Sequence, residues 1–115
     1  MCAALRWRPE ARWIFLACDS PLVTAQALRW LKDQSRPGIW AVQPCQSTEA
    51  IPEPLPGWYD LRATSLLESA RGPSWLARHP RTATPVLPPE HATAWLNFNS
   101  PAEARRLLHG IRTAR

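Results

Sequence analysis

The segment from Trp13 to Pro21 constrains the fold of this chain more than any other stretch. It reads Trp-Ile-Phe-Leu-Ala-Cys-Asp-Ser-Pro, an apolar run that ends in an acid, a serine and a proline. Because the run has no polar alternation, it predicts a strand over residues 13–18 that is buried on both faces, as in a parallel sheet covered by helices. Asp19 then follows the carboxyl end of that strand, where open α/β sheets bind ligands. The sequence therefore predicts an α/β fold with Asp19 as a candidate functional acid.

The residues that follow predict a helix and a second strand. Thr24 is a suitable N-cap for a helix that extends to Ser35, and the turn Arg36-Pro37-Gly38 ends it. Residues 39–43 form a short apolar piece after that turn, which is typical of a strand. Strand, helix and strand at this spacing predict a right-handed βαβ crossover with parallel strands.

The rest of the chain alternates proline-rich connections with short elements. Residues 44–57 contain four prolines and predict a long loop, which is either a functional segment or a stiff connector. Ser100, Pro101 and Glu103 fit a capping box, with the serine at the N-cap, so a helix should run from Pro101 to about Ile111. The other predicted elements are a short strand at residues 58–59, a helix at 61–71 capped by Asp60, and an edge strand at 82–87.

Three stretches resemble motifs of one protein family. Leu-Ala-Cys-Asp-Ser-Pro-Leu, at residues 16–22, is similar to the "LACDxPLL" motif of the MobA-like nucleotidyltransferases, the molybdenum cofactor guanylyltransferase family. Residues 96–103 resemble its "N-x-N-T-P-E-E/D" signature, and residues 52–59 resemble the "PEPLxxxY" segment of one branch. The motifs stand in the family's order, and the resemblance covers about residues 13–108.

The resemblance implies a truncated three-layer Rossmann-like nucleotidyltransferase fold, with a mostly parallel sheet and flanking helices. Complete members begin with a glycine-rich loop of the form L-x-G-G-x-S-x-R-M-G-x-D-K, which resembles other phosphate cradles. The 115 residues of this chain contain four scattered glycines and a single lysine, Lys32, inside a predicted helix. We therefore expect residues 1–115 to be one partial domain, the C-terminal half of the fold, with residues 1–12 as a remnant helix.

The family's activity is the Mg²⁺-dependent transfer of a nucleoside monophosphate from GTP or CTP to a phosphorylated pterin. By resemblance, Asp19 is the catalytic acid that binds the metal. Asn97 and Asn99 would lie on the pterin-phosphate or metal-water side of the crevice, and Pro54 and Leu55 would border it. We expect activity only with a partner that supplies the missing N-terminal half.

Other interpretations of the same residues stay open. Asp19 can be a simple turn residue, and Asn97 and Asn99 can bridge backbone groups where a strand meets a helix. The chain can also be a non-catalytic remnant that binds a ligand or a partner protein through an exposed sheet edge.

Charge and hydropathy limit the remaining classes. A net charge of +5 and arginines near both ends raise the alternative of a small nucleic-acid-binding protein. Arginine is spread along the whole chain, which favours a general compositional bias over one binding patch. No apolar run approaches the roughly 20 residues of a membrane span, so we expect a cytoplasmic protein.

Overall fold

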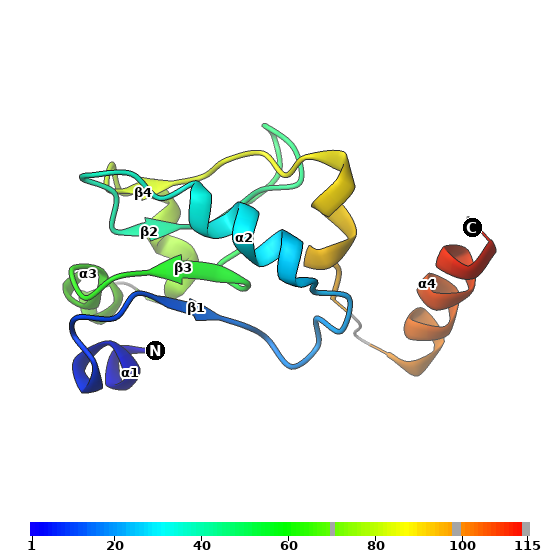
Figure 1. Cartoon of the computed structure of the whole chain (residues 1–115), viewed down its shortest axis with the longest axis horizontal. Helices are drawn as coiled ribbons and strands as arrows, with labels where there is room; N and C mark the ends of the chain where they lie inside the picture. The colour runs from blue at the N-terminus through cyan, green and yellow to red at the C-terminus, as the bar shows by residue number, and fades with distance from the viewer. Residues whose placement is uncertain (70, 98–99, 114–115) are drawn as a thin grey trace.

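A four-stranded sheet forms the centre of this fold, which a computed structural model describes for residues 1–69, 71–97 and 100–113. The strands lie in the order β1, β3, β2, β4 (Figure 1). β3 pairs antiparallel with both of its neighbours, and β2 pairs parallel with β4. The bounds of the strands are Trp13–Phe15 for β1, Ala41–Val42 for β2, Gly57–Tyr59 for β3 and Thr82–Ala83 for β4. The molecule is thus an α/β globule with a mixed sheet.

Strand direction defines two ends of this sheet. β1 and β2 run in the same direction because each is antiparallel to β3, and β4 follows β2. We call the end where β1, β2 and β4 finish the carboxyl end. The opposite end, where these three strands start and β3 finishes, is the amino end. Figure 1 shows α2 running back from the carboxyl end toward the amino end.

Short helices cover both faces of the sheet. Strand side chains alternate between the faces, so Trp58 packs with Leu31 of α2 in one cluster, whereas Tyr59 packs with Leu5 of α1 and Ala63 of α3 in another. One face therefore carries α2 and the other carries α1, α3 and a 3-10 helix, η1. The bounds are Cys2–Trp7 for α1, Ala25–Asp33 for α2, Ala63–Ser69 for α3 and Pro73–Arg78 for η1.

Two helices begin with the caps that the sequence predicts. Thr24 Oγ1 accepts a hydrogen bond from the Ala27 N–H at 3.1 Å and starts α2. Ser100 Oγ accepts from the Glu103 N–H at 3.1 Å and starts α4, Pro101–Thr113. A second 3-10 helix, η2, spans Pro89–Trp95. In the described part of the chain, no helix has the length and apolar character needed to span a bilayer.

The prediction of a central, doubly buried strand at residues 13–18 was wrong. β1 spans only Trp13–Phe15, lies at the edge of the sheet, and is half-buried. Beyond it, Leu16 is 51% exposed. The apolar pattern reports which side chains a strand carries, but the number of neighbouring strands depends on the rest of the sheet. In this chain β3 takes the place between β1 and β2, so β1 has β3 as its one neighbouring strand in the part of the chain that the structure describes.

A mostly parallel sheet was also predicted, and two of the three pairings are antiparallel. The connection from β2 to β3 contains no helix that could carry the chain back over the sheet. The chain therefore returns in the opposite direction, which gives antiparallel pairing. β1, α2 and β2 do form a strand-helix-strand unit with strands in the same direction, but β3 separates them. β4 is an edge strand, as predicted.

Candidate functional site

Asp19 lies in a turn that immediately follows β1, at the carboxyl end of the sheet. The turn is closed by the Ser20 N–H, which donates to the Ala17 carbonyl at 3.3 Å. The Asp19 side chain is half-buried, and its carboxylate has no hydrogen-bond or ion-pair partner within residues 1–69, 71–97 and 100–113. A carboxylate without an internal partner can accept bonds from a ligand or a cation.

A hydrogen bond between Ser20 and Asn97 joins two of the sequence motifs. Ser20 Oγ donates to Asn97 Oδ1 at 2.9 Å, across 77 positions of sequence. Ser20 is only 7% exposed, so this bond lies at the edge of the core and not on a solvated loop. It places Asn97 next to the turn that carries Asp19. Asn99, the other predicted amide, lies outside the described residues.

The third motif reaches the same end of the sheet through β3. Gly57 pairs with Phe15, so the residues just before β3 lie beside the end of β1. Trp95 Nε1 donates to the Pro56 carbonyl at 2.9 Å, and Trp95 precedes Asn97 by two residues. Residues 52–56, the Asp19 turn and the segment from Trp95 to Asn97 therefore gather around the carboxyl end.

Pro54 and Leu55, the predicted substrate neighbours, belong to a tightly held segment. Tyr59 Oη donates to the Pro54 carbonyl at 2.6 Å and accepts from Gln43 Nε2 at 3.0 Å. Burial raises the pKa of Tyr59 to about 12, an effect that the Gln43 bond partly offsets. The Pro54 carbonyl is thus occupied by the protein itself, and this bond holds the backbone at Pro54 against Tyr59.

Glu53 directly precedes Pro54 and is the acidic residue of this segment. Its backbone N–H donates to the Pro44 carbonyl at 2.7 Å, and burial raises the pKa of its side chain. Desolvation disfavours the charged carboxylate. Glu53 is the glutamate of the stretch that resembles the PEPLxxxY segment, but it is not among the predicted site residues.

The metal expected by resemblance is Mg²⁺, which prefers oxygen ligands. In the described part of the chain, no group of three or more His, Cys, Asp or Glu side chains could hold a metal ion. Magnesium in phosphate-transfer sites needs fewer protein ligands, since one or two carboxylates, waters and substrate phosphates complete its octahedron. The unpartnered Asp19 carboxylate fits that pattern, whereas Asn97 Oδ1 already accepts the Ser20 hydroxyl.

Ser20 is the site residue that sequence reasoning missed. A serine before Pro21 predicts the end of a strand, and nothing local indicates that its hydroxyl reaches a distant amide.

No protein-family model matches the chain, and no curated protein matches it at a significant level.

Proposed function

We propose that this chain is the C-terminal half of a MobA-like nucleotidyltransferase of molybdenum cofactor biosynthesis. The reaction is the Mg²⁺-dependent transfer of a nucleoside monophosphate from GTP or CTP to a phosphorylated pterin-type acceptor. The observation that carries the proposal is the Ser20–Asn97 hydrogen bond, which joins the two most specific motifs beside Asp19.

The finer fold that we propose is a three-layer nucleotidyltransferase domain completed by a glycine-rich half. β1 supports this proposal because it is an apolar strand that, among the described residues, pairs with β3 alone. An uncovered apolar edge favours pairing with another strand. Leu16, half exposed just beyond β1, would be covered by such a neighbour. The half that pairs here would also supply the phosphate cradle that this sequence lacks.

Each residue has a defined task in this proposal. Asp19 provides the carboxylate that holds Mg²⁺, and the bound ion neutralises charge on the reacting phosphates. Ser20 and Asn97 fix the turn that carries Asp19, so that the carboxylate keeps one position. Pro54 and Leu55 wall the acceptor side from a backbone that Tyr59 immobilises. The protein contributes to the reaction mainly by aligning the nucleoside triphosphate with the phosphorylated acceptor.

A second candidate is a non-catalytic protein that binds a partner through the same edge of β1. The observation that favours it is apolar exposure, since Leu16 is 51% exposed and Trp7 of α1 is 72% exposed. Both candidates predict association with another polypeptide. Only the first predicts chemistry that depends on Asp19.

The test is label transfer from Mg-GTP or Mg-CTP to molybdopterin. The chain is assayed alone and mixed with the glycine-rich half of a molybdenum cofactor guanylyltransferase. We expect transfer only in the mixture, and we expect Asp19→Ala to lower its rate at least a hundredfold, because the metal loses its protein ligand.

The matched control is Asp33→Ala, which removes an exposed acid at the end of α2, on the amino side of the sheet. It changes the net charge equally and should leave the rate within twofold. A folded mixture without transfer, or equal losses in both variants, would contradict the enzymatic proposal. The partner-binding candidate would then remain.

A further inference from the structure

The amino end of the sheet contains a basic pocket that the proposed nucleotidyl transfer does not use. Its volume is about 540 Å³. Four cationic side chains line it, from the residue before β1, the end of α2 and the segment after β3: Arg12, Lys32, Arg36 and Arg62. Asp19 follows the opposite end of β1, so the pocket and the candidate active site lie at opposite ends of the sheet. We call it the amino-end pocket.

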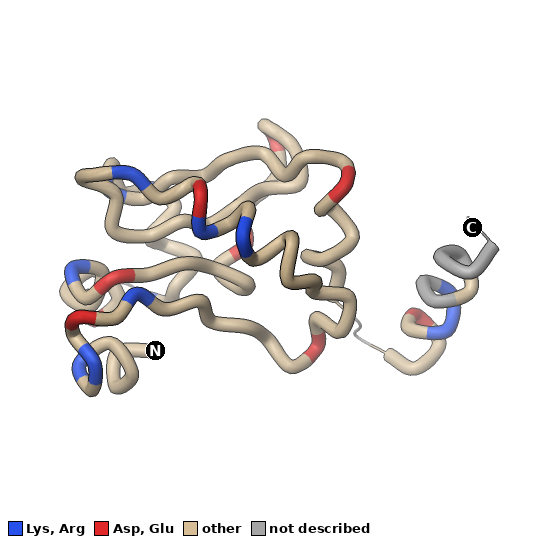
Figure 2. The backbone as a smooth tube through the Cα atoms, in the orientation of Figure 1, with Lys and Arg blue, Asp and Glu red and all other residues tan. Residues whose placement is uncertain are grey.

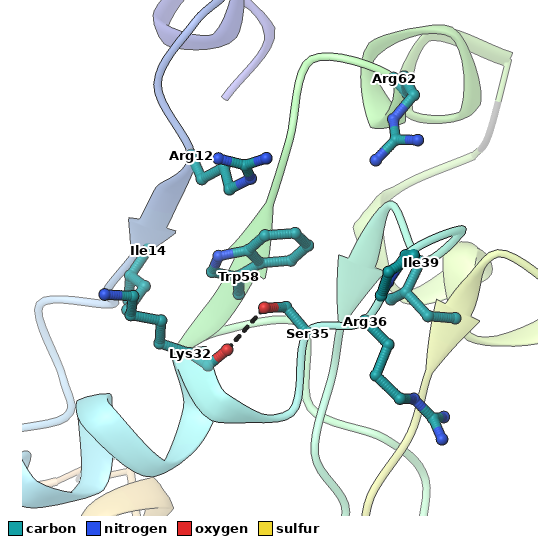
Figure 3. Close-up of a pocket in the computed structure, with 9 residues that line it drawn as sticks. Arg12, Ile14, Lys32, Ser35, Arg36, Ile39, Trp58 and Arg62 are labelled. Atoms are coloured by element: carbon teal, nitrogen blue, oxygen red, sulfur yellow. Dashed lines mark hydrogen bonds between the residues drawn. The ribbon is translucent and has the colours of Figure 1, made fainter.

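Apolar side chains form the floor of the amino-end pocket. Ile14 of β1, Trp58 of β3 and Ile39 before β2 line it. Trp58 is 4% exposed and belongs to the core cluster under α2, so the floor is rigid. Figure 3 shows Arg12 and Arg62 on one side of Trp58 and Lys32 on the side of α2, while the Arg36 side chain extends away from Trp58. A ligand here would meet apolar side chains below and positive charge around it.

The positive charge of this pocket is largely uncompensated. Arg12, Lys32 and Arg36 have no carboxylate partner in the described part of the chain. Arg62 is the exception, because its Nε donates to Asp60 Oδ2 at 3.1 Å, and Asp60 raises the pKa of Arg62. None of the nine lining residues is acidic. Three free cations beside one paired cation favour an anionic ligand.

The carboxyl terminus of α2 would oppose an anion if its carbonyls were free, since a helix end carries about half a negative charge. The structure removes much of that effect. The Lys32 carbonyl accepts hydrogen bonds from Ser35 Oγ at 2.7 Å and from the Ser35 N–H at 3.1 Å. The Leu31 carbonyl accepts a hydrogen bond from the Gln34 N–H at 3.2 Å. Lys32 and Arg36 then outweigh the remaining partial charge.

The surroundings favour a small ligand over a polymer. A neighbouring pocket shares Arg12 and Arg62 but also contains Glu10 and Asp60. On the other side, a separate pocket that shares Arg36 with the amino-end pocket is lined by Asp33. A nucleic-acid backbone that left the amino-end pocket on either side would meet carboxylates. Figure 2 shows the same mixture of basic and acidic segments over α2 and the chain before β1.

We propose that the amino-end pocket binds a small organic phosphate, with the phosphate held by Arg12 and Lys32 and the apolar part of the ligand lying against Ile14 and Ile39. Arginine suits this role because its planar fork makes paired hydrogen bonds to phosphate oxygens.

ADP is the probe, and calorimetric titration of the full chain measures its binding without Mg²⁺. We expect a single ADP per chain and at least tenfold weaker binding of adenosine, which lacks the phosphates. Arg12→Ala should weaken ADP binding at least tenfold. Arg29→Ala, which removes an exposed cation of α2 outside the pocket, should change it less than twofold. Rising salt should weaken ADP binding in the wild-type chain.

Several results would overturn the proposal. These are absence of ADP binding, equal losses in Arg12→Ala and Arg29→Ala, and tighter binding of a single-stranded oligonucleotide than of ADP. Asp19→Ala separates the two sites, since loss of ADP binding in that variant would place the ligand at the carboxyl end. If Arg12→Ala does not fold by circular dichroism, Lys32→Ala at the exposed rim takes its place and should weaken ADP binding at least threefold.

Discussion

Ser20 connects two parts of the chain that lie 77 positions apart, through its hydrogen bond to Asn97. A net contribution of roughly 1 kcal/mol is typical of such a bond, and more is lost when a buried partner stays unsatisfied. Ser20 also directly follows Asp19 in the turn after β1. Removal of the bond should therefore affect both folding stability and the candidate site.

We predict that Ser20→Ala lowers the free energy of unfolding by about 1–2 kcal/mol. Urea denaturation followed by circular dichroism measures it. Ser35→Ala is the control, because Ser35 makes only a local, exposed bond to the Lys32 carbonyl. It should cost about 0.5 kcal/mol or less. Equal losses in the free energy of unfolding of the two variants would show that the Ser20–Asn97 bond stabilises the fold no more than a local, exposed bond does.

Tyr59 gives a second prediction at the residue scale. Its pKa of about 12 in the folded state lies above the ordinary value of 10.0 because burial disfavours the phenolate. Below pH 10 the hydroxyl is protonated in both states, and its contribution to stability is complete. Between pH 10 and 12 only the unfolded state loses the proton, so stability should fall by about 2–3 kcal/mol as pH rises.

Tyr59 is the only tyrosine of the chain, so phenolate absorbance near 295 nm reports its titration directly. The folded protein should titrate well above pH 11, and the urea-unfolded chain near pH 10. Tyr59→Phe should remove this part of the alkaline loss of stability. A folded-state titration near pH 10 would contradict the buried, hydrogen-bonded position of the Tyr59 hydroxyl.

At the scale of elements, local signals predicted helices better than strands. Thr24 and Ser100 cap α2 and α4 as expected, because a cap depends on a few consecutive residues. The position of β1 at the sheet edge could not be deduced, because it depends on where β3 inserts. The Ser20–Asn97 bond and the amino-end pocket likewise join distant segments, which no local pattern indicates.

The start of β3 depends on a glycine. A Cβ on Gly57 would clash with the Pro54 carbonyl oxygen and with the ring of Tyr59. Backbone and a buried ring cannot easily move aside. The close approach of this strand to the preceding loop is therefore possible only without a side chain at residue 57.

We predict that Gly57→Ala lowers the free energy of unfolding by about 2–3 kcal/mol, as overpacking in a core does. Gly72→Ala is the matched control, because a Cβ on Gly72 meets no atom within 4 Å. It should change stability by about 0.5 kcal/mol or less. Thermal unfolding of both variants measures the difference, and a tolerant Gly57→Ala would mean that the loop before β3 can shift.

At the scale of the whole molecule, the sheet has two different ends and one unusual edge. The carboxyl end gathers the three motifs, and the amino end forms the basic pocket. Within the described residues β1 pairs with β3 alone, and Trp13–Phe15 contain none of the charged side chains that usually protect edge strands. These features fit the proposal that the sheet continues into another polypeptide segment.

Amide hydrogen exchange over β1 tests the central claim most directly, namely that a glycine-rich half extends this sheet. The exchange of Trp13–Phe15 is measured for the chain alone and after mixing with the glycine-rich half of a molybdenum cofactor guanylyltransferase. The account predicts that the amides of β1 that do not bond to β3 exchange at least tenfold more slowly in the mixture, while β4 is unchanged. Unchanged exchange along β1, despite an excess of that half, would contradict it.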